Sequence, residues 1–231
     1  MKSFLLIGQS NMSGRGHIGD VPEIINPDCQ MLRNGRWGIM TEPVNPDAPI
    51  FGNIYGDLHS GVCLATSFAD AYQRKFQEKV GLIPCAHGGT SIVEWMPGEI
   101  LFDHAVFMAK LAMRTSELAG ILWHQGCQDT STVELATQHF ERSVVVLNAI
   151  REELGAKALP LLVGELGSFV RLKTDNFDIV NNGLKRLPDV LDKTAFVSAQ
   201  GLTCNQDGVH FDAASLRTFG LRYFEQYLSL R

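Results

Sequence analysis

The sequence lacks both an excess of basic residues and a long apolar run. Its 231 residues include 20 Lys and Arg against 25 Asp and Glu, which gives a formal net charge of −5 at pH 7. Proteins that bind the phosphate backbone usually carry a basic excess or patch, so we expect no nucleic-acid partner. No stretch reaches the roughly 18 consecutive apolar residues of a membrane-spanning helix, so we expect no membrane partner.

Cysteine is scarce and scattered. The cysteines are odd in number and form no Cys-x-x-Cys pair; they are Cys29, Cys63, Cys85, Cys127 and Cys204. Neither a zinc site nor a disulfide framework is predicted, and reduced thiols fit a cytoplasmic protein. The first apolar run, Phe4–Ile7, is shorter than the core of about 7–15 residues in a signal peptide. We therefore expect a buried first strand there, no export leader and a cytoplasmic location.

Five short apolar runs without clean alternation predict strands that are buried on both faces. They are Phe4–Ile7, Val80–Ala86, Gly120–His124, Leu161–Leu166 and Ala195–Ala199. Between them, apolar residues recur at helical spacing around residues 64–76, 107–118, 140–154, 179–187 and 216–227. Strands that alternate with helices are typical of an α/β fold with an open parallel sheet and helices on both faces. We predict one domain over residues 1–231, with five parallel strands.

Residues 15–60 depart from this pattern, because they are rich in Gly, Pro, Asn and Asp and show no sustained periodicity. An irregular stretch of this length is usually functional or disordered. The aromatic residues Trp37, Phe51 and Tyr55 favour a packed loop region over a disordered one.

Polar, Gly-rich segments follow the predicted strands, at the edge where ligands bind in sheets of this kind. Ser10 follows the first strand, and Asp207 stands three residues before His210. That spacing lets the carboxylate hold the imidazole tautomer while the other ring nitrogen faces a serine hydroxyl. The three residues are candidates for a nucleophile, a base and an orienting acid. The alternative is an ordinary turn serine and a capped turn before the last helix.

Two further segments offer hydrogen-bond donors for an oxyanion. Gly88 and Gly89 lack side chains, so their backbone N–H groups allow close approach of a ligand, and Gln125 offers a side-chain amide. The alternative for the glycines is a turn that enters a helix.

Four blocks of sequence, in order along the chain, resemble the sialate O-acetylesterase family of the SGNH hydrolases, which also holds acetylxylan-type carbohydrate esterases. The blocks are Gly8-Gln9-Ser10-Asn11-Met12-Ser13-Gly14-Arg15-Gly16, Gly88-Gly89-Thr90-Ser91-Ile92 with Trp95, Trp123-His124-Gln125-Gly126 with Asp129, and Asp207-x-x-His210. The resemblance implies a flavodoxin-like three-layer α/β/α sandwich that hydrolyses acetyl esters on sugars. It also implies that Ser10 is the nucleophile, His210 the base and Asp207 the orienting acid.

The same resemblance implies an oxyanion hole made by the Ser10 backbone amide, one glycine of the 88–89 pair and Gln125. One position departs from the family pattern, since Cys127 stands where the third block commonly has a glutamate. If that glutamate braces the site, another residue replaces it or activity is weaker. Glu165, at the end of the fourth strand, is the candidate replacement; alternatively it caps a loop.

The substrate-binding candidates are Gln9, Asn11, Arg15, Trp95, His124 and Glu165. Packing is the alternative for Trp95 and His124, and a solvated loop charge is the alternative for Arg15. The remaining loop and helix histidines, His17, His59, His104 and His139, are expected at the surface.

The leading hypothesis is a serine esterase, without metal or cofactor, that removes O-acetyl groups from sialic acid or xylan-type sugars. One alternative is a carbohydrate-binding protein with weakened catalysis. Another is a nucleotide- or phosphate-binding module, because a Gly-rich loop follows the first strand. Against it, neither Gly-x-Gly-x-x-Gly nor Gly-x-x-x-x-Gly-Lys-Ser/Thr occurs.

Overall fold

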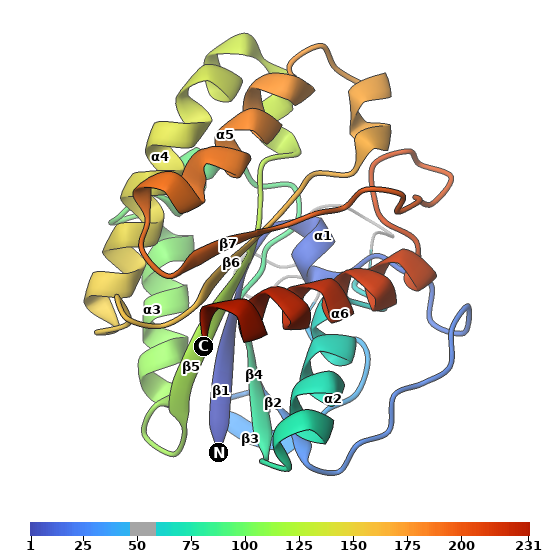
Figure 1. Ribbon diagram of the computed structural model, residues 1–231, viewed down its shortest axis with the longest axis vertical. Coiled ribbons are helices and arrows are strands. Elements are labelled where there is room, and N and C mark those ends of the chain that lie inside the picture. Colours follow the sequence, from blue (N-terminus) through green and yellow to red (C-terminus); the bar gives the residue numbers. More distant parts are fainter. Residues whose placement is uncertain (47–58) are drawn as a thin grey trace.

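Seven strands form one sheet at the centre of the molecule in a computed structural model that describes residues 1–46 and 59–231 (Figure 1). The strands are β1 (Lys2–Gly8), β2 (Cys29–Arg33), β3 (Arg36–Ile39), β4 (Val80–Pro84), β5 (Glu117–His124), β6 (Leu161–Gly164) and β7 (Thr194–Val197). Their order across the sheet is β3-β2-β4-β1-β5-β6-β7. All neighbouring pairs are parallel except β2 and β3, which are antiparallel.

The five apolar runs that predicted strands are confirmed as β1, β4, β5, β6 and β7. These strands form the middle of the sheet and one side of it, where helices cover both faces, so both sets of alternating side chains need to be apolar. Consecutive residues Phe4, Leu5, Leu6 and Ile7 of β1 are accordingly all buried.

The predicted number of five strands is wrong, because β2 and β3 add a hairpin at one edge. The hairpin lies inside the stretch 15–60 that was expected to be irregular. Its turn is Asn34-Gly35, and both residues have positive φ, at 50° and 73°. Asn-Gly between two apolar segments is the strongest short-range hairpin signal, so the sequence does contain the information. The strands are short and β3 is largely exposed, which leaves them without a sustained apolar pattern.

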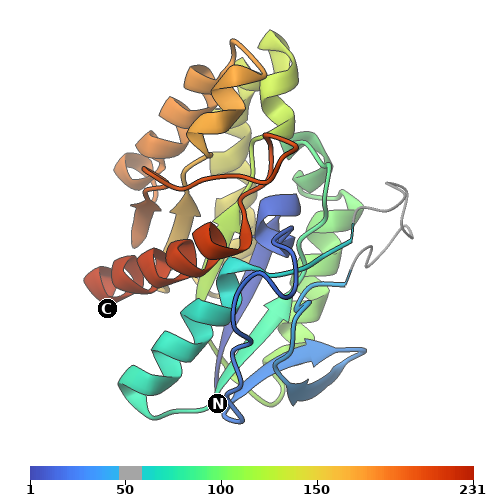
Figure 2. The ribbon, with the colours of Figure 1, turned by 90° about the vertical axis from the view of Figure 1, so that its right-hand side faces the viewer.

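Helices cover the two faces of the sheet in two groups, visible in Figures 1 and 2. One group is α3 (Ile100–Ala112), α4 (Val133–Glu153) and α5 (Phe177–Val190), and the other is α2 (Leu64–Phe76) and α6 (Ala213–Leu230). Each group encloses its own apolar core against the sheet. The result is the three-layer α/β/α sandwich that the resemblance implied. Leu118, expected on the second helix, instead belongs to β5.

Trp37 lies on β3 and packs over Gly81 of β4, while its indole Nε1 donates to Thr115 Oγ1 at 3.0 Å. This aromatic ring therefore packs against the sheet. Phe51 and Tyr55, the other two aromatic residues that favoured a packed loop region, lie outside the described residues. Within residues 1–46 and 59–231, no helix combines the length and the apolar character needed to cross a bilayer.

Candidate active site

Ser10 lies where the chain turns sharply out of β1 into the short helix α1 (Ser10–Ser13). The turn depends on Gly8, whose φ is +131° and whose Cα faces β5 so closely that a Cβ would lie 2.1 Å from the carbonyl oxygen of His124. Only glycine fits such a position. The hydroxyl of Ser10 is thereby presented beyond the carboxyl edge of the sheet, as the sequence predicted.

The side chains of His210 and Asp207 meet Ser10 at this edge. His210 Nε2 lies 2.9 Å from Ser10 Oγ, and His210 Nδ1 lies 2.7 Å from Asp207 Oδ2. The other oxygen of Asp207 accepts from the backbone N–H groups of Val209 and His210, at 2.8 and 2.9 Å. Burial raises the pKa of Asp207, but these hydrogen bonds together outweigh it and leave the pKa below its ordinary value of 3.8. The carboxylate is therefore charged at neutral pH.

Asn11 fixes the backbone that carries His210. Its Nδ2 donates to the carbonyl oxygen of Val209 at 3.1 Å, and its Oδ1 accepts from the N–H of Phe211 at 3.0 Å. The residue is fully buried and lines neither of the pockets beside Ser10 and His210. Both ends of its amide hold the base next to the nucleophile, so the structure places Asn11 behind the site and not at the surface where substrate was expected to bind.

Ser10, Gly88 and Gly89 line the smaller of the two pockets beside the Ser10 hydroxyl, which makes their backbone N–H groups candidates for an oxyanion site. Within residues 1–46 and 59–231, none of these three N–H groups has a backbone acceptor. Gly88 is in close contact with Ser10 and Arg15, since a Cβ at this position would lie 3.5 Å from Ser10 Cβ and 2.6 Å from Arg15 Nη2. Gly89 has φ +75°, a conformation that favours glycine.

Gln125 does not reach this site, which corrects the expectation that it is an oxyanion donor. It is fully buried, and its Nε2 donates to the carbonyl oxygen of Thr90 and to Asp129. Its Oε1 lies 2.7 Å from His139 Nε2. Both ends of the amide are thus hydrogen-bonded behind the Gly88-Gly89 loop. Through Thr90 and His139 the side chain links that loop to α4. Burial raises the pKa of Asp129 to about 6 and lowers that of His139 to about 3.

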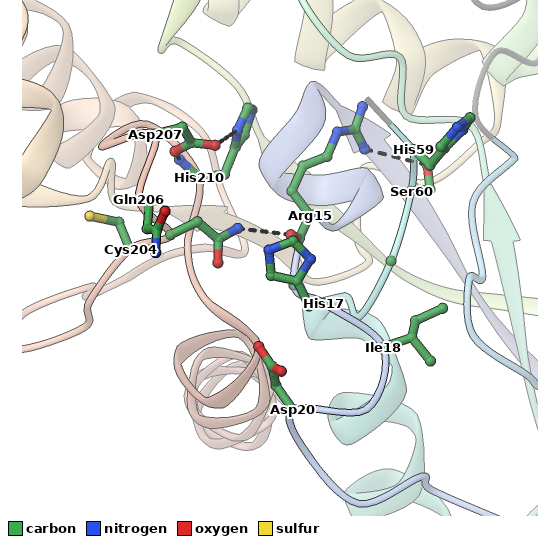
Figure 3. A pocket seen from close by; sticks show the side chains of 13 residues that line it. Arg15, His17, Ile18, Asp20, His59, Ser60, Cys204, Gln206, Asp207 and His210 are labelled. Atoms are coloured by element: carbon green, nitrogen blue, oxygen red, sulfur yellow. Dashed lines mark hydrogen bonds and ion pairs between the residues drawn. The ribbon is translucent and has the colours of Figure 1, made fainter. Parts of the chain in front are cut away.

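Two pockets open from the Ser10–His210 pair. The smaller, of about 190 Å³, is lined by Gln9, Ser10, Arg15, Gly88, Gly89, Cys127, Gln128, Val209 and His210. The larger, of about 740 Å³, shares Arg15 and His210 with it and extends over polar side chains that include His17, Asp20, His59 and Gln206 (Figure 3). The His210 side chain therefore borders both pockets.

Gln9 and Arg15 are the substrate-binding candidates that the structure brings to the pockets. Gln9 Oε1 accepts from the N–H groups of Gly126 and Gln128, at 3.1 and 3.3 Å, which fixes the direction of its amide. Arg15 Nη1 donates to Ser13 Oγ, the Gly14 carbonyl and Ser60 Oγ, and its guanidinium lies between the two pockets.

Trp95 and His124 do not line either pocket. Trp95 is fully buried, donates to Thr90 Oγ1 at 3.1 Å and packs edge-on against Trp123, so it cannot stack on a sugar. His124 is also fully buried, donates from Nε2 to the Glu165 carbonyl at 3.1 Å, and has its pKa lowered to about 4 by burial. For both residues the packing alternative holds.

Glu165 lies away from Ser10 and joins β6 to the segment after β7. One carboxylate oxygen accepts from Asn181 and lies 3.2 Å from Lys185 Nζ, and the other accepts from the Ser198 hydroxyl and the Ala199 N–H. The predicted replacement of the missing brace is therefore wrong, because the four donors tie Glu165 into the loop structure.

Cys127 lines the smaller pocket in the position where a glutamate was expected. Its thiol accepts from Asn11 Nδ2 at 3.7 Å, and burial raises its pKa to about 12, so the thiol is neutral. His210 has no need of a brace from this position, because its Nδ1 lies against Asp207.

One histidine is not where the sequence predicted it. His139 was expected at the surface but is fully buried against Gln125. His17 and His59 are exposed, as expected, and they also line the larger pocket. The position of His139 on α4, one turn before the buried Ser143, is a weak signal that could have indicated an inward-facing side chain.

Acyl transfer needs a nucleophilic hydroxyl, an imidazole hydrogen-bonded to it and a carboxylate hydrogen-bonded to the imidazole. It also needs N–H donors beside the hydroxyl. Comparisons with known proteins give matches along the whole chain. A model of the family described as carbohydrate esterase, sialic acid-specific acetylesterase, matches residues 1–229. The probable carbohydrate esterase At4g34215 of Arabidopsis thaliana is 27% identical over 248 residues, which cover 98% of this chain and 90% of the relative.

Solved structures extend these matches. The X-ray structure of AT4G34215 from Arabidopsis thaliana has a TM-score of 0.87 at 26% identity and covers 99% of this chain and 98% of its own. The crystal structure of NanS has a TM-score of 0.79 at 15% identity, with 98% and 96% covered. That of XAC1771, a carbohydrate acetylesterase from Xanthomonas citri, has a TM-score of 0.70 at 18% identity, with 97% and 55% covered. At these identities the last two share the fold.

Proposed function

This chain belongs to the sialic acid-specific acetylesterase family of carbohydrate esterases, and from that membership we propose that it removes O-acetyl groups from sugars through Ser10, His210 and Asp207. As a member of this family it is a carboxylic ester hydrolase of the SGNH type. The observation that carries the proposal is the continuous hydrogen-bond path from Asp207 through His210 to Ser10, at 2.7 and 2.9 Å.

The first half-reaction transfers the acyl group to the enzyme. His210 Nε2 takes the proton of Ser10 Oγ while that oxygen attacks the ester carbonyl carbon. The negative charge that develops on the carbonyl oxygen is stabilised by the N–H groups of Ser10 and of the Gly88-Gly89 loop. The bond between the carbonyl carbon and the sugar oxygen then breaks, and His210 gives its proton to that oxygen.

The second half-reaction restores the enzyme. Water loses a proton to His210 and attacks the acyl-serine, the bond to Ser10 Oγ breaks, and Ser10 recovers its proton while the acid is released. Asp207 stays ionised throughout, because its hydrogen bonds hold its pKa below the ordinary value, and it stabilises the protonated imidazole in each half.

The larger pocket supports a sugar as the alcohol part of the ester. It adjoins His210, which protonates the departing oxygen, and its side chains offer both donors and acceptors for hydroxyl groups, including Asp20, His17 and Gln206. Within the family's range, the two substrate classes that we propose are O-acetylated sialic acid and acetylated xylan-type sugars.

Acetate release from a panel of O-acetylated sugars tests the proposal. The panel contains acetylated sialic acids, acetylated xylo-oligosaccharides and an acetylated aliphatic alcohol. We expect acetate from at least one sugar class at a rate that exceeds the rate for the alcohol. Sugar binding without acetate release, measured in parallel by calorimetry, contradicts the proposal and favours a binding protein.

A further inference from the structure

The smaller pocket lies on the side of Ser10 where the acyl group has to go. The oxyanion occupies the N–H groups of Ser10 and the Gly88-Gly89 loop, and the departing oxygen has to face His210. Ser10 does not line the larger pocket, whereas His210 and Asp207 do, so we assign that space to the alcohol. The remaining substituent of the carbonyl carbon therefore points toward Cys127, Gln128 and Val209.

This acyl pocket is larger than an acetyl group requires. Its volume is about 190 Å³. One water molecule takes about 30 Å³ in the liquid, so the pocket corresponds to roughly six such molecules. The methyl group of acetate fills only a fraction of that space even after the carbonyl group is placed, so there is room for further methylene groups.

Cys127 bounds the pocket at a fixed position. The side chain is buried to all but 8% of its surface, and the donor Asn11 Nδ2 holds its sulfur at 3.7 Å. A neutral thiol presents a small, polarizable surface that behaves as a hydrophobic group. An acyl chain that extends beyond acetyl meets this surface without having to desolvate a charge.

We propose that the pocket accepts acyl groups longer than acetyl, up to about butyryl, and that Cys127 determines this upper length. The proposal rests on the function proposed above, since it assigns the acyl part of the substrate of the same site. It predicts that the enzyme selects its natural substrates by their sugar part and accepts several lengths of acyl group.

Hydrolysis of p-nitrophenyl acetate, propionate, butyrate and hexanoate measures the length preference, because all four share one leaving group. We expect kcat/KM for butyrate within about tenfold of the value for acetate. A pocket that fits only acetyl would discriminate by roughly 10–200-fold for each added methylene group. A butyrate-to-acetate ratio below one tenth overturns the inference.

Two substitutions at Cys127 shift the preference in opposite directions. Cys127→Leu fills the pocket, and we expect it to lower the butyrate-to-acetate ratio at least tenfold. Cys127→Ala enlarges the pocket, and we expect it to raise the hexanoate-to-acetate ratio at least tenfold. Opposite shifts cannot arise from a general loss of folding, since misfolding lowers all rates together.

Cys204 provides the matched control, because it lines the larger pocket on the alcohol side. Cys204→Leu is expected to leave both ratios within twofold of the parent values. Parent-like ratios in both Cys127 variants overturn the assignment of Cys127. If the leucine variant does not fold, the alanine variant and the parent profile still decide the question.

The same data separate the two proposals. Turnover of acetate with none of butyrate contradicts only the length inference. Absence of turnover on every ester contradicts the proposed function itself and this inference with it.

Discussion

The side-chain amide of Asn11 is hydrogen-bonded to the backbone on both sides of His210, through the carbonyl of Val209 and the N–H of Phe211. Asn11 directly follows the proposed nucleophile in the sequence, so one short segment supplies the hydroxyl and also holds the base opposite to it. The distance of 2.9 Å between His210 Nε2 and Ser10 Oγ depends on this connection between residues about 200 positions apart.

Asn11→Ala is therefore expected to reduce kcat by about 100-fold with little change in KM, because a shift of the base by about 1 Å is sufficient for such a loss. The variant also leaves the buried N–H of Phe211 without an acceptor, which costs about 1–3 kcal/mol of stability. Steady-state kinetics and thermal unfolding measure the two effects separately.

Asn26→Ala is the control for that experiment. Asn26 is also buried, and it donates to Asp70 and Gln73 of α2, on the opposite edge of the sheet from the site. This variant should lose stability and keep kcat. Equal losses of kcat in the two variants would show that Asn11 has no special positioning effect.

Ser10→Ala should reduce the hydrolysis of p-nitrophenyl acetate by about 10⁴-fold or more, because the attacking oxygen is removed. Among the described residues the Ser10 hydroxyl hydrogen-bonds to His210 alone, so the fold should persist in the circular dichroism spectrum. Ser229→Ala, at the exposed end of α6, serves as the control and should retain full activity. Retained turnover in the Ser10 variant would falsify its assignment as nucleophile.

Gly88→Ala should reduce kcat/KM by about 100- to 1,000-fold. The added Cβ would lie 2.6 Å from Arg15 Nη2, and the Arg15 head group is held by three acceptors, so the loop that carries the N–H donors has to move. Loss of one oxyanion donor costs roughly 3–4 kcal/mol in the transition state. Gly38→Ala is the comparison, since a Cβ on that exposed strand meets no atom within 4 Å. Wild-type kinetics in the Gly88 variant would contradict the oxyanion assignment.

The buried histidines predict how stability depends on pH. Burial lowers the pKa of His124 to about 4 and that of His139 to about 3, whereas the unfolded chain titrates near the ordinary value of 6.5. Between these values the unfolded chain binds two protons that the folded chain does not. Asp129 acts in the opposite direction, because its pKa rises from 3.8 to about 6 and the folded chain keeps its proton.

The net difference in this window is one proton in favour of the unfolded state. The free energy of unfolding should therefore fall by about 1.4 kcal/mol for each pH unit as the pH decreases from about 6 to about 4. His139→Gln removes one of the two proton sites and should nearly abolish that slope in urea titrations. The same substitution at the exposed His17 should leave the slope unchanged, and an unchanged slope in the His139 variant would exclude the proposed linkage.

The part of the site that could be predicted is the part that depends on strand ends. Ser10 follows a buried apolar run, and parallel strands end at one edge, so the approach of Ser10 to the Asp207-x-x-His210 turn follows from topology. The hairpin β2–β3 was missed for lack of a long apolar pattern, although its Asn34-Gly35 turn is a local signal.

The direction of each side chain beyond a strand end could not be predicted. Gln9 faces the pocket and Asn11 faces the core, although both are polar amides within one turn of Ser10. Gln125 resembles an oxyanion donor in sequence, but its amide donates to Asp129 and to the Thr90 carbonyl, and these hydrogen bonds orient the side chain toward the core. Such choices depend on partners from distant parts of the chain, and periodicity carries no information about them.

The turn that carries Asp207 and His210 comes after all seven strands in the chain, and it is fastened to a side chain in the first twenty residues. Any part of the chain that is synthesised before residues 207–210 consequently holds the hydroxyl but not the imidazole. We therefore expect no esterase activity from a fragment that ends before this turn.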